Sequence, residues 1–185
     1  MTSNEFKKEI RLSGSGGQGL ITAGIILARA AVRDKYRVTQ TQSYGPESRG
    51  GASRADVIIS NGDFYFPEAT RFDILLCLTQ EACDKYSENL KDTGILIADS
   101  SFINNITLLD STIYEIPFTN IISEKLGTPL PANIAALSFL VRKTQVVSET
   151  SLKEALKNSI KSAYLDLNNK AMRIGFKLAD EYLKV

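Results

Sequence analysis

The sequence of 185 residues contains no histidine, no tryptophan and only two cysteines, Cys77 and Cys83. Histidine is the usual general base near neutral pH and the commonest metal ligand. Its absence excludes Ser–His and Cys–His nucleophile systems and argues against a zinc site. Two thiols are too few for an iron–sulfur cluster, which normally takes four cysteine ligands. The composition therefore favours a binding or assembly role, and we predict no catalytic residue and no metal site in this chain.

The two cysteines are six positions apart and form no C-x-x-C pair. Cys77 lies in the apolar run DILLCL, where a small thiol is commonly buried. Disulfides are rare in cytosolic proteins. We therefore predict a buried free thiol at Cys77 and no disulfide.

The chain also lacks an excess of charge of one sign and any long apolar run. Its 22 basic and 21 acidic residues leave a net charge of +1, which gives no bulk attraction to nucleic acid or to a membrane. The charged start MTSNEFKKE does not match a signal peptide, and no segment has the length and apolarity of a membrane helix. Without a repeat or a linker, the sequence predicts a single domain over residues 1–185 in a cytoplasmic protein.

Strands and helices alternate along most of the chain, which predicts an α/β fold. A capping box at Ser151 and Glu154 and a turn at Asn61-Gly62, leading into a hairpin strand at 64–66, are further local signals. The pattern is typical of a doubly wound, mostly parallel, Rossmann-like sheet with a helical C-terminal segment. Strands are expected at 9–12, 37–41, 56–60, 73–78, 94–98 and 112–116, and helices at 17–32, after Thr79, and at 131–143, 151–161 and 162–184.

A glycine-rich motif lies between the first expected strand and helix, in RLSGSGGQGLITAGIILARAA. Its G-x-G-x-x-G spacing lets backbone N–H groups approach a phosphate, and the helix that follows offers its positive N-terminal end. A tight turn without a ligand is the alternative. The candidate phosphate-binding residues are Gly14, Ser15, Gly16, Gly17, Gln18 and Gly19.

Two common uses of such a motif are disfavoured. NAD binding calls for a carboxylate at the end of the second strand to hold the ribose, and the residues there, Gln40 to Gln42, carry none. No G-x-x-x-x-G-K-[ST] motif occurs, which excludes a Walker-type ATPase.

A second unusual stretch follows the second expected strand, in QTQSYGPESRGGASR. Arg49 and Arg54 carry guanidinium groups suited to phosphate or carboxylate oxygens, and Ser43 and Tyr44 are further candidates for binding. Ion pairing of the arginines with Glu47, Asp56 or a neighbouring subunit is the alternative. Because both stretches follow the carboxyl ends of strands, we expect them to lie close together.

The two stretches together resemble the gamma subunit of 2-oxoacid:ferredoxin oxidoreductases. The similarity runs through GSGGQGLITAGIILARAA and TQTQSYGPESRGGASRADVIIS, and includes FDILLCLTQEACDKY, GILIADSS and PANIAALSFL. Within it, QTQSYGPESRGG is most similar to the 2-oxoglutarate enzyme of this family, 2-oxoglutarate synthase. The resemblance covers nearly the whole chain.

This resemblance implies a subunit of an enzyme that decarboxylates a 2-oxoacid, transfers the acyl group to coenzyme A and passes electrons to ferredoxin. It implies partner alpha, beta and sometimes delta subunits, which would hold thiamine diphosphate, Mg²⁺ and the iron–sulfur clusters. Coenzyme A is the ligand implied for this chain, with its phosphates on the glycine turn and on Arg49 or Arg54, unless that loop docks on the thiamine-binding subunit. The alternatives are a stand-alone nucleotide or coenzyme A binding module, the small subunit of a pyruvate, branched-chain or indolepyruvate enzyme, and an NAD-dependent dehydrogenase.

Overall fold

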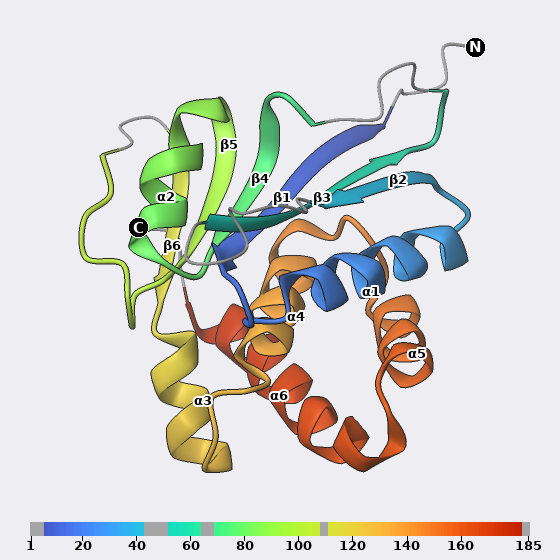
Figure 1. Cartoon of the computed structure of the whole chain (residues 1–185). Helices are drawn as coiled ribbons and strands as arrows, with labels where there is room; N and C mark the ends of the chain where they lie inside the picture. Colours follow the sequence, from blue (N-terminus) through green and yellow to red (C-terminus); the bar gives the residue numbers. More distant parts are fainter. Residues whose placement is uncertain (1–5, 43–51, 64–68, 108–110, 183–185) are drawn as a thin grey trace.

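The computed structural model describes residues 6–42, 52–63, 69–107 and 111–182, and these form one six-stranded sheet with helices on both faces (Figure 1). The strand order is β2-β3-β1-β4-β5-β6. The strands are β1 (Lys7–Ser15), β2 (Arg37–Gln42), β3 (Ala52–Ser60), β4 (Phe72–Cys77), β5 (Leu90–Asp99) and β6 (Thr112–Ile116).

The sheet is mostly parallel, as the sequence predicts. Strands β1, β4, β5 and β6 pair in parallel, whereas β3 is antiparallel to both β1 and β2. The antiparallel strand follows from chain length, because the connection 43–51 is shorter than the crossover of about a dozen residues that parallel pairing requires. The expected hairpin strand at 64–66 lies outside the described residues.

The helices are distributed unequally over the two faces. Five of them pack on one face around the larger core cluster, below the sheet in Figure 1, whereas α2 covers a smaller cluster on the other face. The helices are α1 (Leu20–Arg33), α2 (Gln80–Tyr86), α3 (Phe118–Leu126), α4 (Ala132–Thr144), α5 (Glu149–Ser159) and α6 (Ser162–Glu181), and a short 3-10 turn, Ser87–Asn89, follows α2.

Two helix starts differ from those expected. Helix α1 begins at Leu20 rather than at residue 17, because Gly17 and Gly19 have φ angles of +88° and +71°, which no α-helix contains. Helix α5 begins at Glu149, and its cap is Ser148, whose side chain accepts a hydrogen bond from the Ser151 backbone N–H at 3.1 Å. The predicted capping box at Ser151 was therefore wrong by three residues.

Helix α3 was not predicted. Proline after an apolar run typically marks the end of a strand, but Pro117, which follows β6, is also the N-cap residue of α3. The helix ends at Gly127, whose φ of +73° is typical of the glycine that terminates a helix.

Gly175 in α6 marks the closest approach between two helices of the larger core. A Cβ atom at this position would lie 2.1 Å from the carbonyl oxygen of Ala135 in α4. Glycine is therefore required at this position for α4 and α6 to pack backbone against backbone.

A buried ion pair lies on the opposite face of the sheet. Arg11 in β1 and Asp56 in β3 stand opposite each other, with Nε–Oδ1 and Nη2–Oδ2 distances of 2.6 Å. The guanidinium group lies 4.2 Å from the ring centroid of Phe72 and 4.5 Å from that of Tyr86. The pair satisfies both buried charges and ties β1 to β3, since a buried charge without a partner is strongly destabilising.

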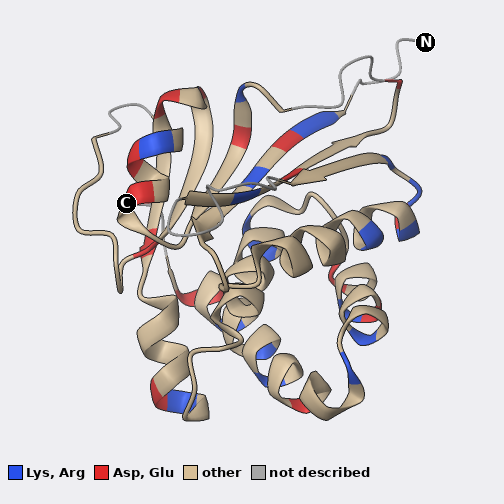
Figure 2. Cartoon of the chain, viewed as in Figure 1, with Lys and Arg blue, Asp and Glu red and all other residues tan. Residues whose placement is uncertain are grey.

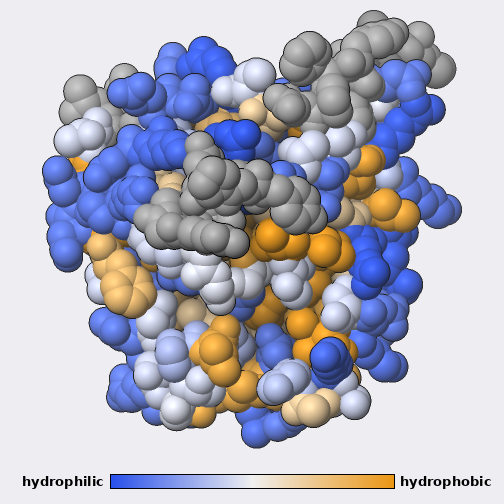
Figure 3. Space-filling model, in the orientation of Figure 1, coloured by the Kyte–Doolittle hydropathy of each residue, from blue (hydrophilic) through white to orange (hydrophobic). Residues whose placement is uncertain are grey.

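Charged residues of both signs are interspersed over the molecule (Figure 2). Apolar surface gathers near the middle of the face shown in Figure 3, over α1. In the described part of the chain, no helix combines the length and apolar character needed to cross a bilayer.

Candidate functional site at the carboxyl edge of the sheet

A cavity of about 220 Å³ lies at the carboxyl edge of the parallel strands. Its walls come from the segments that follow β1, β4, β5 and β6 and from the start of α4. Open α/β sheets bind their ligands at this edge. The lining residues are Gly17, Gln18, Leu78, Phe102, Thr119, Pro129, Leu130, Ala132 and Asn133.

The glycine turn is held in shape by Gln18. The side-chain oxygen of Gln18 accepts a hydrogen bond from the Ser15 backbone N–H at 2.8 Å, and its Nε2 donates to the Leu78 carbonyl at 3.5 Å. A Cβ atom at Gly14 would lie 2.3 Å from the same side-chain oxygen. The first glycine of the motif thus makes room for an internal brace, and the amide of Gln18 is occupied within the turn.

Asn133 connects the glycine turn to α4. Its Nδ2 donates to the Gly19 carbonyl at 3.0 Å, and its Oδ1 accepts from the Ile134 backbone N–H at 2.9 Å. A Cβ atom at Gly19 would lie 2.5 Å from Nδ2 of Asn133. Sequence analysis missed this residue, although a single asparagine at the start of a mostly apolar helix was a signal.

The N-termini of α1 and α4 therefore meet beside the cavity. Gly19 is the N-cap of α1 and Pro131 that of α4, and neither helix has a side-chain cap hydrogen bond. The first turn of a helix has N–H groups without intrahelical partners and carries a partial positive charge. At the start of α4, however, the N–H groups of Ala132 and Ile134 already donate to the carbonyl oxygens of Pro129 and Pro131, so α1 has the more open start.

A third helix start, that of α3, is already matched with a negative charge. Asp99 at the end of β5 is fully buried, and its carboxylate accepts hydrogen bonds from the Thr119 hydroxyl at 2.6 Å, the Thr119 N–H at 3.1 Å and the Ser101 N–H at 3.0 Å. Asp99 thus fixes Thr119 in the cavity wall. The sequence placed Asp99 at a strand end but gave no indication of its partners.

The start of β3 lies beside the glycine turn. Ser53 pairs with Gly14 and Ala52 with Ser15, so the second stretch enters the sheet next to the first, as expected. Arg54 is half-buried opposite Ser13, and Asp56, one of its candidate partners, is bound by Arg11. The remaining candidates of this stretch, Ser43, Tyr44, Glu47 and Arg49, lie outside the described residues.

The two cysteines lie in the same buried cluster on the other face of the sheet. Cys77 ends β4, Cys83 lies in α2, and both are buried free thiols. Burial raises the pKa of Cys77 well above its ordinary value, while hydrogen bonding from Cys77 lowers the pKa of Cys83 to about 7. The free, buried thiol predicted at Cys77 is confirmed. The presence of Cys83 in the same cluster was not predicted, because six residues of sequence do not reveal the turn between β4 and α2.

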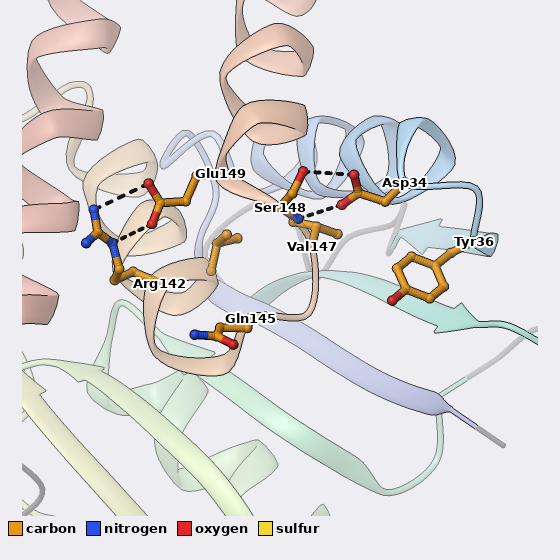
Figure 4. A pocket seen from close by; sticks show the side chains of 8 residues that line it. Asp34, Tyr36, Arg142, Gln145, Val147, Ser148 and Glu149 are labelled. Atoms are coloured by element: carbon orange, nitrogen blue, oxygen red, sulfur yellow. Dashed lines mark hydrogen bonds and ion pairs between the residues drawn. The ribbon is translucent and has the colours of Figure 1, made fainter. Parts of the chain in front are cut away.

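A second, larger cavity lies at the amino edge of the sheet, where α1 ends and β2 begins (Figure 4). It has a volume of about 520 Å³. Figure 4 shows its charged side chains engaged in pairs, Asp34 with Ser148 and Arg142 with Glu149. We assign this cavity to the packing of α5 against α1 and α4.

Asp34 is the main link across that cavity. Its carboxylate accepts hydrogen bonds from the Ser148 N–H at 2.5 Å, the Ser148 hydroxyl at 2.8 Å and the Ser151 hydroxyl at 2.6 Å. Burial raises the pKa of Asp34, but the hydrogen bonds from Ser151 and Ser148 outweigh it, and the pKa is lowered. The carboxylate is therefore ionised and serves as an anchor for the start of α5.

Metal ligation has no support among the residues that the structure describes, since no three His, Cys, Asp or Glu side chains gather in a way that could hold an ion. The site at the carboxyl edge is built instead from backbone N–H groups, amides, one hydroxyl and apolar side chains.

Comparison with known proteins places these features in a family. Residues 9–178 match the family model of pyruvate ferredoxin/flavodoxin oxidoreductases. The chain is 44% identical over 180 residues to the 2-oxoglutarate synthase subunit KorC of Methanocaldococcus jannaschii, with 96% of each chain covered.

Solved structures agree with this match. The crystal structure of a keto/oxoacid ferredoxin oxidoreductase gamma subunit from Geobacter sulfurreducens has a TM-score of 0.86 and 43% identity, covering 95% of this chain and 99% of that one. The 2-oxoglutarate:ferredoxin oxidoreductase from Magnetococcus marinus, solved with 2-oxoglutarate, coenzyme A and succinyl-CoA bound, shares the fold with a TM-score of 0.86 at 24% identity, and the likeness covers 97% of this chain and 32% of that one. The chain belongs to the pyruvate ferredoxin/flavodoxin oxidoreductase family.

Proposed function

We propose that this chain is the gamma subunit of a multi-subunit 2-oxoacid:ferredoxin oxidoreductase whose substrate is 2-oxoglutarate. The observation that carries the proposal is the similarity to a 2-oxoglutarate synthase subunit along nearly the whole of both chains. The assembled enzyme decarboxylates the 2-oxoacid, transfers the acyl group to coenzyme A and delivers electrons to ferredoxin.

The side chains present favour a supporting rather than a redox role for this subunit. The chain has two cysteines and no histidine, and both thiols are buried, so its donor set does not fit an iron–sulfur cluster. The partner alpha, beta and delta subunits accordingly hold the clusters, thiamine diphosphate and Mg²⁺. Thiamine diphosphate supplies the stabilisation of the carbanion that decarboxylation creates.

The carboxyl-edge cavity is the proposed contact of this subunit with coenzyme A. The glycines of the turn, Gly16, Gly17 and Gly19, and the start of α1 offer backbone N–H groups to a phosphate, whereas the Ser15 N–H is bound by the Gln18 side chain. Phe102 and Leu130, which are 48% and 74% exposed, provide apolar surface for the pantetheine arm. Arg54, at the start of β3, and the sequence candidates Ser43, Tyr44 and Arg49 lie on the stretch that enters the sheet beside this turn.

The size of the cavity indicates that the coenzyme site is shared. Pockets that enclose a cofactor measure about 300–1,000 Å³. The volume of about 220 Å³ takes one part of coenzyme A, and a partner subunit encloses the rest. This explains why large apolar side chains remain exposed beside a phosphate-type turn.

The first test is the composition and activity of the native complex. The complex is isolated anaerobically, without dissociation, and its mass and visible absorption are measured. We expect a brown assembly that contains this chain and reduces ferredoxin with 2-oxoglutarate and coenzyme A, faster than with pyruvate or branched-chain 2-oxoacids. A colourless monomer or homodimer that binds coenzyme A unaided would support a stand-alone binding module instead.

A matched pair of variants tests the placement of coenzyme A within the assembled enzyme. Leu130→Asp puts a charge on the apolar wall of the carboxyl-edge cavity, whereas Val32→Asp does the same on α1 at another exposed position. We expect Leu130→Asp to raise the KM for coenzyme A about tenfold, corresponding to about 1.4 kcal/mol of lost binding, and Val32→Asp to leave it unchanged. Equal KM values for coenzyme A in the two variants would show that the coenzyme does not bind in this cavity. If the Leu130→Asp subunit no longer assembled into the complex, the surface around Leu130 would instead be a contact with another subunit.

A further inference from the structure

We propose that the groove between α5 and α6 is a docking site for an acidic segment of another subunit, in which carboxylates flank an apolar side chain. Only the identity of the partner, as a subunit of the same complex, rests on the proposed function. The groove shares no lining residue with the carboxyl-edge cavity.

The groove lies between two helices that are consecutive in the chain. Helix α5 ends at Ser159 and α6 begins at Ser162, so two residues join them. The groove has a volume of about 420 Å³. Its lining residues are Lys153, Glu154 and Lys157 from α5 and Leu165, Asn169, Met172 and Arg173 from α6.

The floor of the groove is mostly apolar. Leu165, Asn169 and Met172 follow one another at spacings of four and three residues, so they lie on one face of α6. Leu165 is half-buried and Met172 is buried. Methionine adapts its shape to an apolar neighbour, and a stripe of this kind suits an amphipathic segment laid into a groove.

The rims of the groove carry three exposed cations, Lys153 and Lys157 on α5 and Arg173 on α6. In the part of the chain that the structure describes, none of the three forms an ion pair, although Glu154 lines the same groove. Together with Glu154 they leave the groove a net charge of +2. Such a surface attracts an acidic partner and repels a basic one.

Other lysines of α6 show that the fold can neutralise a cation locally. Lys170 is paired with Asp166 at 2.7 Å, and Lys177 lies 3.5 Å from Glu181. Both pairs join residues four positions apart on the helix. The unpaired cations are thus gathered at the groove, which indicates that their counter-ions come from outside the chain.

The positions of the cations favour a chain with separated carboxylates over one phosphate. Lys153 and Lys157 are about one helical turn apart, or about 6 Å along α5. The Nζ atom of Lys153 lies 5.7 Å from the ring centroid of Phe176, which is three residues from Arg173 on α6. Lys153 and Arg173 therefore mark one end of the groove, and Lys157 marks the other. A carboxylate at each end, with an apolar residue between them, matches this arrangement.

Zero-length cross-linking of the native complex tests the contact. The complex is isolated anaerobically without dissociation and treated with a carbodiimide, which joins a lysine amine to a touching carboxylate as an amide. We expect mass spectrometry to find Lys153 or Lys157 linked to an Asp or Glu of another subunit. An intact, active complex in which both lysines stay unlinked, or link only to carboxylates of this chain, would overturn the proposal.

A matched pair of variants tests the contribution of the charges to assembly. The triple variant Lys153→Ala, Lys157→Ala, Arg173→Ala removes the rim cations, and the control Lys170→Ala, Lys177→Ala removes exposed cations that are already paired. Alanine is the best helix former, so both variants should fold. We expect the triple variant to leave the complex at a several-fold lower NaCl concentration than wild type, and the control to behave as wild type. Equal behaviour of the two variants would contradict the docking site.

Failure of this proposal is distinguishable from failure of the proposed function. A brown, active complex without the cross-link contradicts the docking site alone, whereas a colourless chain isolated without partners contradicts both. Acetylation of Lys153 and Lys157 that inorganic phosphate prevents, in a complex that gives no cross-link, would identify a small-anion site instead. If the complex stays intact at every salt concentration, the cross-link map decides.

Discussion

The two edges of the sheet carry cavities of opposite kinds. At the amino edge the larger cavity is lined by charged and polar side chains that are engaged with one another, such as Asp34 with Ser148 and Arg142 with Glu149. At the carboxyl edge the smaller cavity is lined by a glycine turn, two helix N-termini and exposed apolar side chains. The comparison teaches that volume and polarity alone do not identify a ligand site. Polar side chains that already bond to one another indicate a cavity that belongs to the packing of the fold. A helix start beside exposed apolar surface indicates instead a site for a ligand with an anionic group and an apolar arm.

The largest expected effect is at Gly19, on the carboxyl edge. Gly19→Ala forces a left-handed conformation at a cost of about 1–2 kcal/mol, and its Cβ displaces Asn133, whose hydrogen bond is worth a further ~1–3 kcal/mol in this half-enclosed position. We expect a loss of 2–5 kcal/mol (roughly) in unfolding free energy, measured by urea denaturation, together with a raised KM for coenzyme A in the assembled enzyme.

Gly17 provides the matched control for that variant. It has a φ of +88°, but a Cβ atom there would meet nothing within 4 Å. Gly17→Ala therefore carries the conformational cost alone, about 1–2 kcal/mol. If the two variants lose equal stability, the contact between Gly19 and Asn133 does not join the two helix starts as described.

The amino edge should respond in stability and not in ligand binding. Asp34→Ala removes the acceptor for the Ser148 N–H and for the hydroxyls of Ser148 and Ser151, which predicts a loss of about 1–3 kcal/mol in unfolding free energy. Asp180→Ala, which breaks a more exposed ion pair with Arg142 near the same cavity, should cost about 1 kcal/mol or less. A raised KM for coenzyme A in Asp34→Ala would contradict the interpretation of the amino-edge cavity as a packing feature without a role in ligand binding.

The cysteine pair, just behind the carboxyl edge, should show a shifted titration. The hydrogen bond with Cys77 lowers the pKa of Cys83 to about 7, Ser87 adds to this, and burial and the charges of Asp84 and Glu115 oppose it. Iodoacetamide labelling of Cys83 in the native protein should thus rise with pH around a midpoint near 7. In Cys77→Ala, which removes the donor, the midpoint should move up toward the ordinary thiol value. An unchanged midpoint would mean that Cys77 is not the main cause.

The sequence predicted those elements whose signals are local. Every described strand was anticipated, because β-branched and apolar runs such as DVIIS and GILIA report burial directly. The glycine turn was also predicted, because its G-x-G-x-x-G spacing is a local signal. Helix α3 was missed because Pro117 carries two local meanings, strand stop and helix start, and the sequence favoured the first.

The partners within the site were beyond local signals. The contacts of Asn133 with Gly19 and of Asp99 with Thr119 each join segments brought together by strand order or by a turn. The strand order also places β3 beside β1, and this allows Asp56 to form its ion pair with Arg11. Spacing along the chain specifies none of these pairs, since they depend on tertiary packing.

The smallest expected effect is the acid response of the amino edge. The pKa of Asp34 lies below its ordinary value of 3.8 in the folded protein, so its ionised form is favoured by folding. Its contribution to stability is therefore present in full above that value and is lost as the pH falls through the lower, folded pKa. The stability difference between wild type and Asp34→Asn, measured by urea unfolding, should be constant near neutral pH and shrink below about pH 4. A difference that persists to the lowest pH at which both proteins fold would show that the anchor at α5 does not depend on the charge of Asp34. The carboxyl-edge cavity has no such carboxylate among its described lining residues, so the stability difference between wild type and Leu130→Asn should stay constant over the same pH range.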